Sequence, residues 1–197
     1  MMFDTNTMQI NHNKQIYNPN FQAIKMSYKP TIQMLDKTSG IYKDKDATLI
    51  KIDFSNRQDI VAIQSLISKW QNARYIRYIC SLANYGGEDI SIYAITNQKN
   101  NFKVLDADKI LSICAVDSFC KEADIFGEYI QTDPTLLCSE LPKYSKTGRE
   151  LVNGLKEYYN SISIIPRAEE KVIRFMTRNG FKFESPNSSR MIWRKQS

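Results

Sequence analysis

A short basic segment in the second half of the chain combines residue types that bind anions. It runs Lys143-Tyr-Ser-Lys-Thr-Gly-Arg-Glu-Leu151 and leads into an amphipathic stretch that predicts a helix. The first backbone amides of a helix have no partner within it and lie at the positive end of its dipole. Gly148 lets the backbone approach a ligand closely, and three basic side chains add charge. The segment therefore predicts a phosphate site.

The same segment also has a simpler explanation. Thr147 and Glu150 could cap the helix, and lysines beside a capped helix are common on protein surfaces. Two further patterns favour the phosphate site. One is Ile173-Arg-Phe-Met-Thr-Arg-Asn-Gly-Phe181, a helical stretch closed by Asn-Gly, which is a C-cap signal. The other is Glu128-Tyr-Ile-Gln-Thr-Asp-Pro134, which predicts a strand that ends at the proline.

Together these patterns resemble the GNAT (Gcn5-related N-acetyltransferase) superfamily, whose members transfer acetyl from acetyl-CoA to an amine. In that superfamily a loop of the form Arg/Gln-x-x-Gly-x-Gly/Ala precedes a helix, and its amides hold the CoA pyrophosphate. Here Lys143 stands at the Arg/Gln position, Lys146 at the first glycine and Gly148 at the last position. The segment 173–181 is similar to the superfamily's Phe-Tyr-x-x-x-Gly-Phe segment. The resemblance covers about residues 47–195.

The resemblance implies where acetyl-CoA binds as co-substrate. The strand 128–134 is similar to the one whose edge pairs with pantetheine, and the basic segment would hold the pyrophosphate. The implied donor-binding residues are Ile130, Gln131, Thr132, Lys143, Ser145, Lys146, Thr147, Gly148 and Arg149.

Catalysis would require a base and a way to release the thiol. A lysine-type amine has a pKa of ~10.4, so a proton must leave before the amine attacks the thioester. Glu128 is the first candidate for the base and Asp133 the second, although Glu128 could also be an ordinary surface carboxylate. The tyrosine that often serves as the acid in this superfamily is Met176 here, which cannot donate a proton. Tyr144, Tyr158 or a water could replace it, the thiolate could leave unaided, or catalysis could be lost.

The four cysteines and the single histidine do not indicate a metal site. There is no CxxC pair, and His12 lies far along the chain from Cys80, Cys114, Cys120 and Cys138. A zinc site needs closer ligand spacing. We expect no metal and free thiols in a reducing compartment, the cytoplasm, with a disulfide framework as the alternative.

Composition excludes several protein classes. A chain of 197 residues with 42% hydrophobic and 24% charged residues predicts one packed domain rather than a disordered chain. No stretch approaches the ~20 apolar residues of a membrane-spanning helix, and the first ten residues do not resemble a signal peptide. The 27 basic and 21 acidic residues give a net charge of +6, which favours an anionic partner. Without a run of like charges, this excess does not single out nucleic acid.

Hydrophobic periodicity predicts the elements that must position the basic segment. Strands are expected over 47–54, 90–96, 109–119, 126–132, 161–165, 181–184 and 190–195. Helices are expected from a cap at 55–58 to about 70, over 73–83, from 147 to about 159, and over 169–178. The resulting order is β-α-α-β-β-β-α-β-α-β-β. It indicates an α/β fold class, an α+β mixed sheet with helices on its faces, as the GNAT resemblance also implies.

The chain divides into two parts at about residue 45. Residues 1–45 are rich in asparagine with isolated hydrophobic residues, and they predict an N-terminal arm that is flexible or docked on the domain or on a second subunit. Residues 46–197 form the expected GNAT-like acyltransferase domain. Within it, Tyr75 and Tyr78 could line an acceptor pocket, with a solvated helix face as the alternative.

The expected function is an N-acetyltransferase that moves acetyl from acetyl-CoA to a primary amine by direct attack in a ternary complex. The alternative is a non-catalytic GNAT-fold module that binds CoA or a macromolecular partner, which Met176 and the irregular loop 143–148 favour. The acceptor amine is left open: a small metabolite, a protein lysine or N-terminus, or an aminoacyl-tRNA as the one expected nucleic acid. No membrane partner is expected. A homodimer is common in the superfamily and is the expected assembly by resemblance only.

Overall fold

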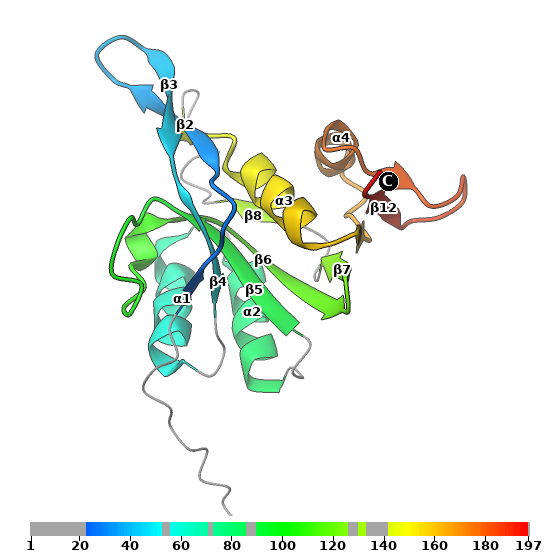
Figure 1. The fold of residues 1–197 in the computed structure, drawn as a ribbon, viewed down its shortest axis with the longest axis horizontal. Helices are drawn as coiled ribbons and strands as arrows, with labels where there is room; N and C mark the ends of the chain where they lie inside the picture. The colour runs from blue at the N-terminus through cyan, green and yellow to red at the C-terminus, as the bar shows by residue number, and fades with distance from the viewer. Residues whose placement is uncertain are drawn as a thin grey trace, which may run out of the picture.

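The computed structural model describes residues 23–52, 56–70, 73–85, 90–125, 130–132 and 142–196 (Figure 1). Its centre is a mixed sheet in the order β1-β4-β5-β6-β7-β10-β12-β11, with β8 also paired to β6. The only parallel pairing among the described strands joins β7 to β10. The strands of this sheet are β1 (Ile24–Lys25), β4 (Thr48–Ile52), β5 (Ile90–Thr96), β6 (Ile110–Phe119), β7 (Glu122–Ile125), β8 (Gln131–Thr132), β10 (Ser161–Ile164), β11 (Lys182–Phe183) and β12 (Met191–Arg194).

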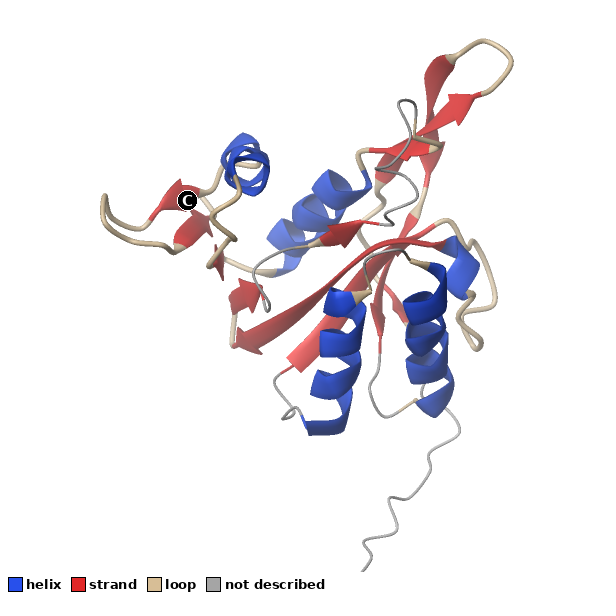
Figure 2. Cartoon of the chain, turned by 180° about the vertical axis from the view of Figure 1, so that it is seen from behind, coloured by secondary structure: helices blue, strands red, loops and turns tan. Residues whose placement is uncertain are grey.

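Helices cover both faces of this sheet. α1 (Arg57–Lys69) and α2 (Arg74–Tyr85) lie side by side on one face, and α3 (Thr147–Tyr158) lies on the other (Figure 2). α4 (Glu170–Arg178) packs beyond α3, near β12 (Figure 1). A short 3₁₀ helix, η1 (Ala107–Lys109), leads into β6.

Alternation along the strands creates two cores. Leu49 and Ile95 belong to the cluster under α3, whereas Ile50 and Ile92 belong to the cluster under α1 and α2. All four side chains are fully buried. Because successive strand residues point to opposite faces, a sheet with helices on both sides needs hydrophobic residues at consecutive positions. The central strands carry such runs, and the core therefore has two layers.

The predicted α/β class and the mixed sheet are confirmed. From β4 onward the predicted elements occur in the predicted order, but the structure adds two short strands before α3, β7 and β9 (Tyr144–Ser145). The differences lie mainly at the ends of elements. α1 is capped by Asn56, whose side chain accepts a hydrogen bond from the Gln58 amide, and Ser55 lies outside the described residues. Only residues 130–132 of the predicted strand 126–132 are described. β7 precedes that range and was not predicted, because two of its four residues are the charged Glu122 and Asp124, which leaves little apolar signal.

A second, smaller sheet contains the start of the basic segment. β2 (Thr31–Asp36) and β3 (Ile41–Asp46) form a hairpin that projects from the body (Figure 1). Gly40 closes its turn at a φ of 69°, a conformation that favours glycine. β9 (Tyr144–Ser145) pairs with the other edge of β2, in the order β3-β2-β9. Two residues of the basic segment, Tyr144 and Ser145, are therefore in a strand where a loop was expected.

The chain between β1 and β2 crosses α3 and is bound to it by side chains. The Tyr28 hydroxyl donates to Glu150 Oε2 at 2.7 Å, and the Thr31 amide donates to the same oxygen at 3.3 Å. The Tyr28 amide donates to the Tyr158 hydroxyl at 3.0 Å. Burial, together with the neighbouring carboxylate, raises the pKa of Tyr28, because both disfavour a phenolate. Glu150 therefore holds the N-terminal segment in place, and the capping role predicted for it is wrong.

Close packing at Gly154 makes one prediction. A Cβ at this position would stand 2.6 Å from Leu49 Cδ2 and 3.1 Å from Tyr28 Cδ1. We expect Gly154→Ala to lower the free energy of unfolding by about 1–3 kcal/mol, because overpacking outweighs the gain in helix propensity. Urea denaturation measures the change. The matched control is Gln64→Ala on the exposed side of α1, expected within about 0.5 kcal/mol of the wild type. A stabilised Gly154→Ala protein would contradict the packing.

Candidate functional site

The central sheet divides beyond β7. β7 and β10 are paired in parallel from Glu122 opposite Ser161 to Ile125 opposite Ile164. Further along, β8 remains paired with β6, whereas β10 ends and the chain turns toward α4. α3 and β8 consequently lie on one side of the division, and α4 and β12 on the other (Figure 1). Among the described strands, β8 pairs with β6 alone, so no described strand lies along its other edge.

The N-terminus of α3 lies at this division. A Cβ on Gly148 would stand 3.2 Å from Thr132 Oγ1 of β8 and 3.5 Å from Phe175 Cζ of α4. Residues from α3, β8 and α4 therefore meet at Gly148, and a larger side chain there would push them apart. The glycine serves this approach of protein elements in addition to any approach of a ligand.

The turn into α3 has an unusual backbone. Lys146 is the N-cap residue at φ 67° and ψ 1°, the left-handed region, and no side chain caps the helix there. The first helical bond runs from the Glu150 amide to the Lys146 carbonyl at 2.9 Å. The amides of residues 147–149 precede that bond and have no acceptor within the helix. Left-handed backbone costs a residue with a Cβ roughly 1–2 kcal/mol, so the surrounding contacts must impose it.

Neighbouring contacts fix this turn on both sides. The Leu35 amide donates to the Lys143 carbonyl at 2.9 Å, which continues the pairing of β9 with β2. The Ser112 hydroxyl of β6 donates to the Thr147 carbonyl at 3.2 Å. The turn is therefore held between the N-terminal hairpin and the central sheet.

Basic side chains surround the start of α3. Lys143 is exposed, and its ammonium lies 5.3 Å from the Tyr144 ring centroid. The Arg149 side chain is 48% exposed, with Nε 3.7 Å from Glu150 Oε1. Across Phe175, α4 adds a shallow pocket of about 330 Å³ lined by Glu170, Lys171, Arg174, Phe175 and Arg178. Positive charge and free helical amides together favour an anion at this point.

Tyr75 of α2 reaches the sheet where β7 gives way to β8. β6 pairs with β7 through Val116 and with β8 through Ile113. Between them the Ala115 amide donates to the Tyr75 hydroxyl at 3.1 Å. Tyr75 is 2% exposed, so the solvated helix face considered for the two tyrosines is wrong for this residue. Tyr78 is exposed. Buried tyrosine hydroxyls need a partner, and this one supports the interrupted ladder.

The structure brings part of the predicted donor site together. Thr132, Lys146, Thr147, Gly148 and Arg149 gather around the start of α3. Ser145 is in β9, just before the start of α3, and Lys143 directly precedes β9. Gln131 is in β8. Ile130 is half-buried against the core under α3. Glu128 and Asp133 lie outside the described residues.

The hydroxyl groups considered for proton donation have other partners. Tyr144 is buried, and its hydroxyl accepts a hydrogen bond from Asn97 Nδ2 at 2.9 Å. The Tyr158 hydroxyl, near the far end of α3, is bonded to the Tyr28 amide. Met176 is 1% exposed in the core under α3. Its neighbour Phe175 is the α4 residue that lies against Gly148.

The described cysteines do not form an activated thiol. Cys80, Cys114 and Cys120 are free, and burial raises the pKa of Cys80 and Cys114. Cys138 lies outside the described residues. In the described part of the chain, no three His, Cys, Asp or Glu side chains are grouped to hold a metal ion. No described helix is both long and apolar enough to cross a bilayer.

Sequence reasoning missed Lys156, which joins α3 to the other side of the division. Its ammonium donates to the Asn179 carbonyl at the end of α4 at 2.5 Å. It also lies 5.1 Å from the Trp193 ring centroid and 5.9 Å from that of Phe181. Burial lowers the pKa of Lys156. The basic residue in the last turn of α3 was a weak signal, because such residues usually serve only the helix dipole.

Comparison with known proteins gives structural similarity without sequence matches. No protein-family model matches the sequence, and no curated protein matches it. The ribosomal-protein-S18-alanine N-acetyltransferase of Escherichia coli is similar at 14% identity and a TM-score of 0.46, over 74% of this chain and 90% of that chain. The N-acetyltransferase PseH of Campylobacter jejuni, solved with acetyl coenzyme A, is similar at 13% and 0.47, over 75% and 99%.

A third similar structure is the PaiA N-acetyltransferase of Thermoplasma acidophilum with coenzyme A. It has 13% identity and a TM-score of 0.44, over 78% of this chain and 100% of that chain. Similarity at this level leaves the function to be argued from the site itself.

The left-handed backbone at Lys146 makes a second prediction. We expect Lys146→Gly to raise the free energy of unfolding by about 1 kcal/mol and Lys146→Val to lower it by about 1–2 kcal/mol. Urea denaturation measures both. The control is Gln64→Gly, at an ordinary helical position, which should lose about 1 kcal/mol. Destabilisation of Lys146→Gly to the same extent as the control would mean that the turn is not left-handed in solution.

The buried ammonium of Lys156 predicts a dependence on pH. Its pKa in the folded protein lies below the ordinary value of 10.5, so between these two values the folded state binds fewer protons than the unfolded state. The free energy of unfolding should therefore rise with pH across that window. The difference between wild type and Lys156→Met, measured by urea denaturation at several pH values, should grow accordingly. Titrations common to both proteins cancel in this difference.

The exposed and uncharged Gln64 of α1 provides the control for this series. Gln64→Met removes no ionisable group, so it should differ from the wild type by the same amount at every pH. A difference for Lys156→Met that stays flat or shrinks as the pH rises would show that burial does not penalise the charged form.

Proposed function

We propose that this chain is a GNAT-type N-acyltransferase that holds the pyrophosphate of acetyl-CoA at the N-terminus of α3. One observation carries the proposal: α3 begins uncapped from a left-handed residue, beside a divided sheet and among basic side chains. Free amides, a helix dipole and nearby cations are what a pyrophosphate requires.

The backbone at Lys146 supports the resemblance at its weakest point. The GNAT-like loop has glycine where this chain has Lys146, and glycine is the residue that adopts left-handed backbone freely. Lys146 has this conformation despite its side chain. The chain therefore retains the backbone shape of the loop although it has lost the residue type.

The described residues fit an extended thioester ligand in two ways. The amides of residues 147–149 and the Arg149 side chain would bind the pyrophosphate. β8 is paired with β6 along one edge, and its other edge would be available to the amides of the pantetheine arm. Acetyl-CoA supplies an acyl group activated as a thioester. Holding this thioester and an amine in one orientation would supply much of the rate.

The transfer itself balances without a protein acid. The amine nitrogen, once deprotonated, attacks the thioester carbonyl carbon, the C–S bond breaks and the thiolate leaves. The nitrogen gives up a second proton to the base or to water as the amide forms. A thiol pKa of ~8.5 makes the thiolate a tolerable leaving group that water can protonate. The candidates for the base remain Glu128 and Asp133, in the cytoplasmic enzyme that the free cysteines favour.

A non-catalytic CoA-binding module is the second candidate. The observation that favours it is the residue at the usual proton-donor position: Met176 cannot donate a proton and is buried in the core, and Tyr144, a possible replacement, is buried as well. Such a module would bind acetyl-CoA without turning it over. Binding and turnover must therefore be measured separately.

Calorimetric titration of the purified protein with acetyl-CoA tests the donor site. We expect micromolar binding that Arg149→Glu weakens by about tenfold or more, because reversing a charge beside a pyrophosphate costs more than 1 kcal/mol. Lys182→Glu changes the net charge equally on an exposed position of β11 and should bind as the wild type does. If both substitutions weakened acetyl-CoA binding equally, the effect would come from the net charge of the protein and not from Arg149. No binding at millimolar acetyl-CoA would contradict the proposal.

A second variant tests the donor site again, and release of thiol separates the enzyme from the module. Gly148→Trp should abolish acetyl-CoA binding, because its side chain would enter the space shared by Thr132 and Phe175. Circular dichroism shows whether the variant is folded, and Arg149→Glu carries the test if it is not. Release of thiol from acetyl-CoA on addition of a panel of primary amines identifies an enzyme. Binding without thiol release with any of these amines identifies the module.

A further inference from the structure

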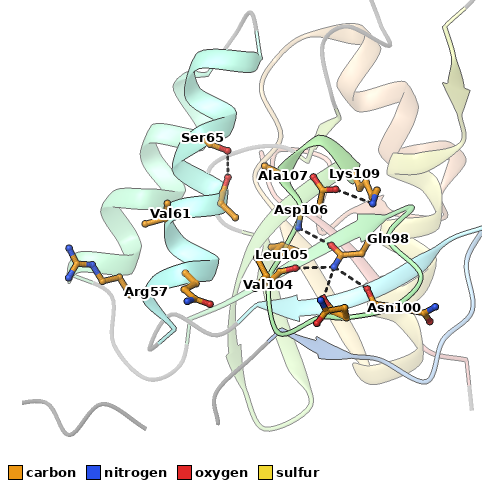
Figure 3. Close-up of a pocket in the computed structure, with 13 residues that line it drawn as sticks. Arg57, Val61, Ser65, Gln98, Asn100, Val104, Leu105, Asp106, Ala107 and Lys109 are labelled. Atoms are coloured by element: carbon orange, nitrogen blue, oxygen red, sulfur yellow. Dashed lines mark hydrogen bonds and ion pairs between the residues drawn. The ribbon is translucent and has the colours of Figure 1, made fainter. Parts of the chain in front are cut away.

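A second candidate site lies on the opposite side of the sheet from α3. It is an open groove of about 990 Å³ between α1 and the connection from β5 to β6 (Figure 3). One wall is the surface of α1 along Arg57, Val61 and Ser65. The other wall is the loop from Gln98 to Lys109. No part of the proposed acyl-donor site contributes to it.

The loop wall is built as a fixed structure. The side chain of Gln98, 6% exposed, donates to the carbonyls of Asn101 and Val104 at 2.9 and 3.0 Å. Its Oε1 accepts from the Asp106 amide at 2.9 Å. Lys69 at the end of α1 forms an ion pair with Asp108. These bonds tie parts of the loop to the Gln98 side chain and to the end of α1, so the loop forms a fixed wall of the groove.

The groove exposes apolar surface that nothing described covers. Val61 on α1 and Val104 on the loop are 55% and 58% exposed. Leu105 and Ala107 are buried between them. Two large apolar side chains facing one open groove favour a ligand with apolar side chains of its own.

The described chain begins beside this groove. Ile24 pairs with Lys51, so Ala23 comes opposite Ile52 at the end of β4. Ala23 is 2% exposed and belongs to the same buried cluster as Ile63 and Leu66 of α1. Asn56 follows Ile52 by four positions in the sequence, so their Cα atoms lie at most about 14 Å apart. The chain that precedes Ala23 therefore leaves the fold near the Arg57 end of the groove.

We propose that residues 1–22 of this same chain pack into the groove between α1 and the loop 98–109. The wall from Arg57 to Ser65 is about 12 Å long at 1.5 Å per helical residue. Roughly four extended residues span that length, so a 22-residue segment reaches along it with chain to spare.

The composition of the segment fits the groove. Its apolar residues are Met1, Met2, Phe3, Met8, Ile10, Ile16, Tyr17 and Phe21. They can cover the exposed valines, while the asparagines between them can bond to backbone at the rim. Attachment at Ala23 makes the contact intramolecular, with an effective concentration that a separate ligand lacks. This is why the occupant is this segment rather than a second copy of the chain. The inference does not depend on acetyl-CoA binding.

Trypsin cleavage tests the proposal on the full chain. Lys14 is the only lysine or arginine among the first 22 residues, so cleavage after it gives one product that intact mass identifies. Proteolysis follows the population of the undocked segment when docking is rapid. We expect Val61→Glu and Val104→Glu each to speed this cleavage by about tenfold. Phe183→Glu, a matched substitution at a 45% exposed residue on β11, should leave the rate unchanged.

A variant of the segment itself provides a second measurement. Met8→Asp with Ile10→Asp should give the same acceleration, and combining these with Val61→Glu should add little, because both changes remove one contact. Cleavage of each denatured chain corrects for any direct effect of the new charges on trypsin. Rates that match the wild type in every groove variant, or effects that add fully, would overturn the proposal. A dimer in sedimentation that Val61→Glu dissolves, with unchanged cleavage at Lys14, would also overturn it and assign the groove to a second copy.

Discussion

The close packing of α3 against the central sheet is the constraint on which the rest of the structure depends. Gly154 allows α3 to approach until Leu49 and Tyr28 would touch a Cβ, and Gly148 allows the same approach to Thr132 and Phe175. Two glycines on one helix therefore set its height above the sheet and the position of its first turn. The position of the candidate anion site follows from this packing, because the amides of the site belong to the first turn of α3.

The N-terminal part of the chain supports the turn that begins α3. Glu150, in the first turn of α3, accepts hydrogen bonds from the Tyr28 hydroxyl and from the Thr31 amide, and Arg149 Nε lies 3.7 Å from its other oxygen. The pairing of β2 with β9 holds the turn that contains the left-handed Lys146. Residues 23–46 thus contribute both a strand of the central sheet, β1, and the contacts that hold the site.

Side chains add to the strand pairing that joins the two sides of the divided sheet. β7 and β10 are paired directly. Lys156 of α3 bonds to the end of α4 and lies near the rings of Phe181 and Trp193. Phe175 of α4 lies against Gly148 at the other end of α3. A ligand between the layers would therefore lie between parts of the protein that strand pairing and these side chains hold together.

The amino-acid sequence was sufficient for features that arise from local patterning. Alternation and helical spacing predicted the α/β class, the order of the helices α1 to α4 and the C-cap at Gly180, which has a φ of 78°, but not the short strands β7 and β9. It also predicted the basic residues at the start of α3, because they are neighbours along the chain. Only the tertiary structure assigned Glu150 to Tyr28, Tyr144 to Asn97 and Tyr75 to Ala115. These partners are 40 to 122 residues apart, and hydrogen bonds at such separations depend on how the layers pack, about which local periodicity carries no information.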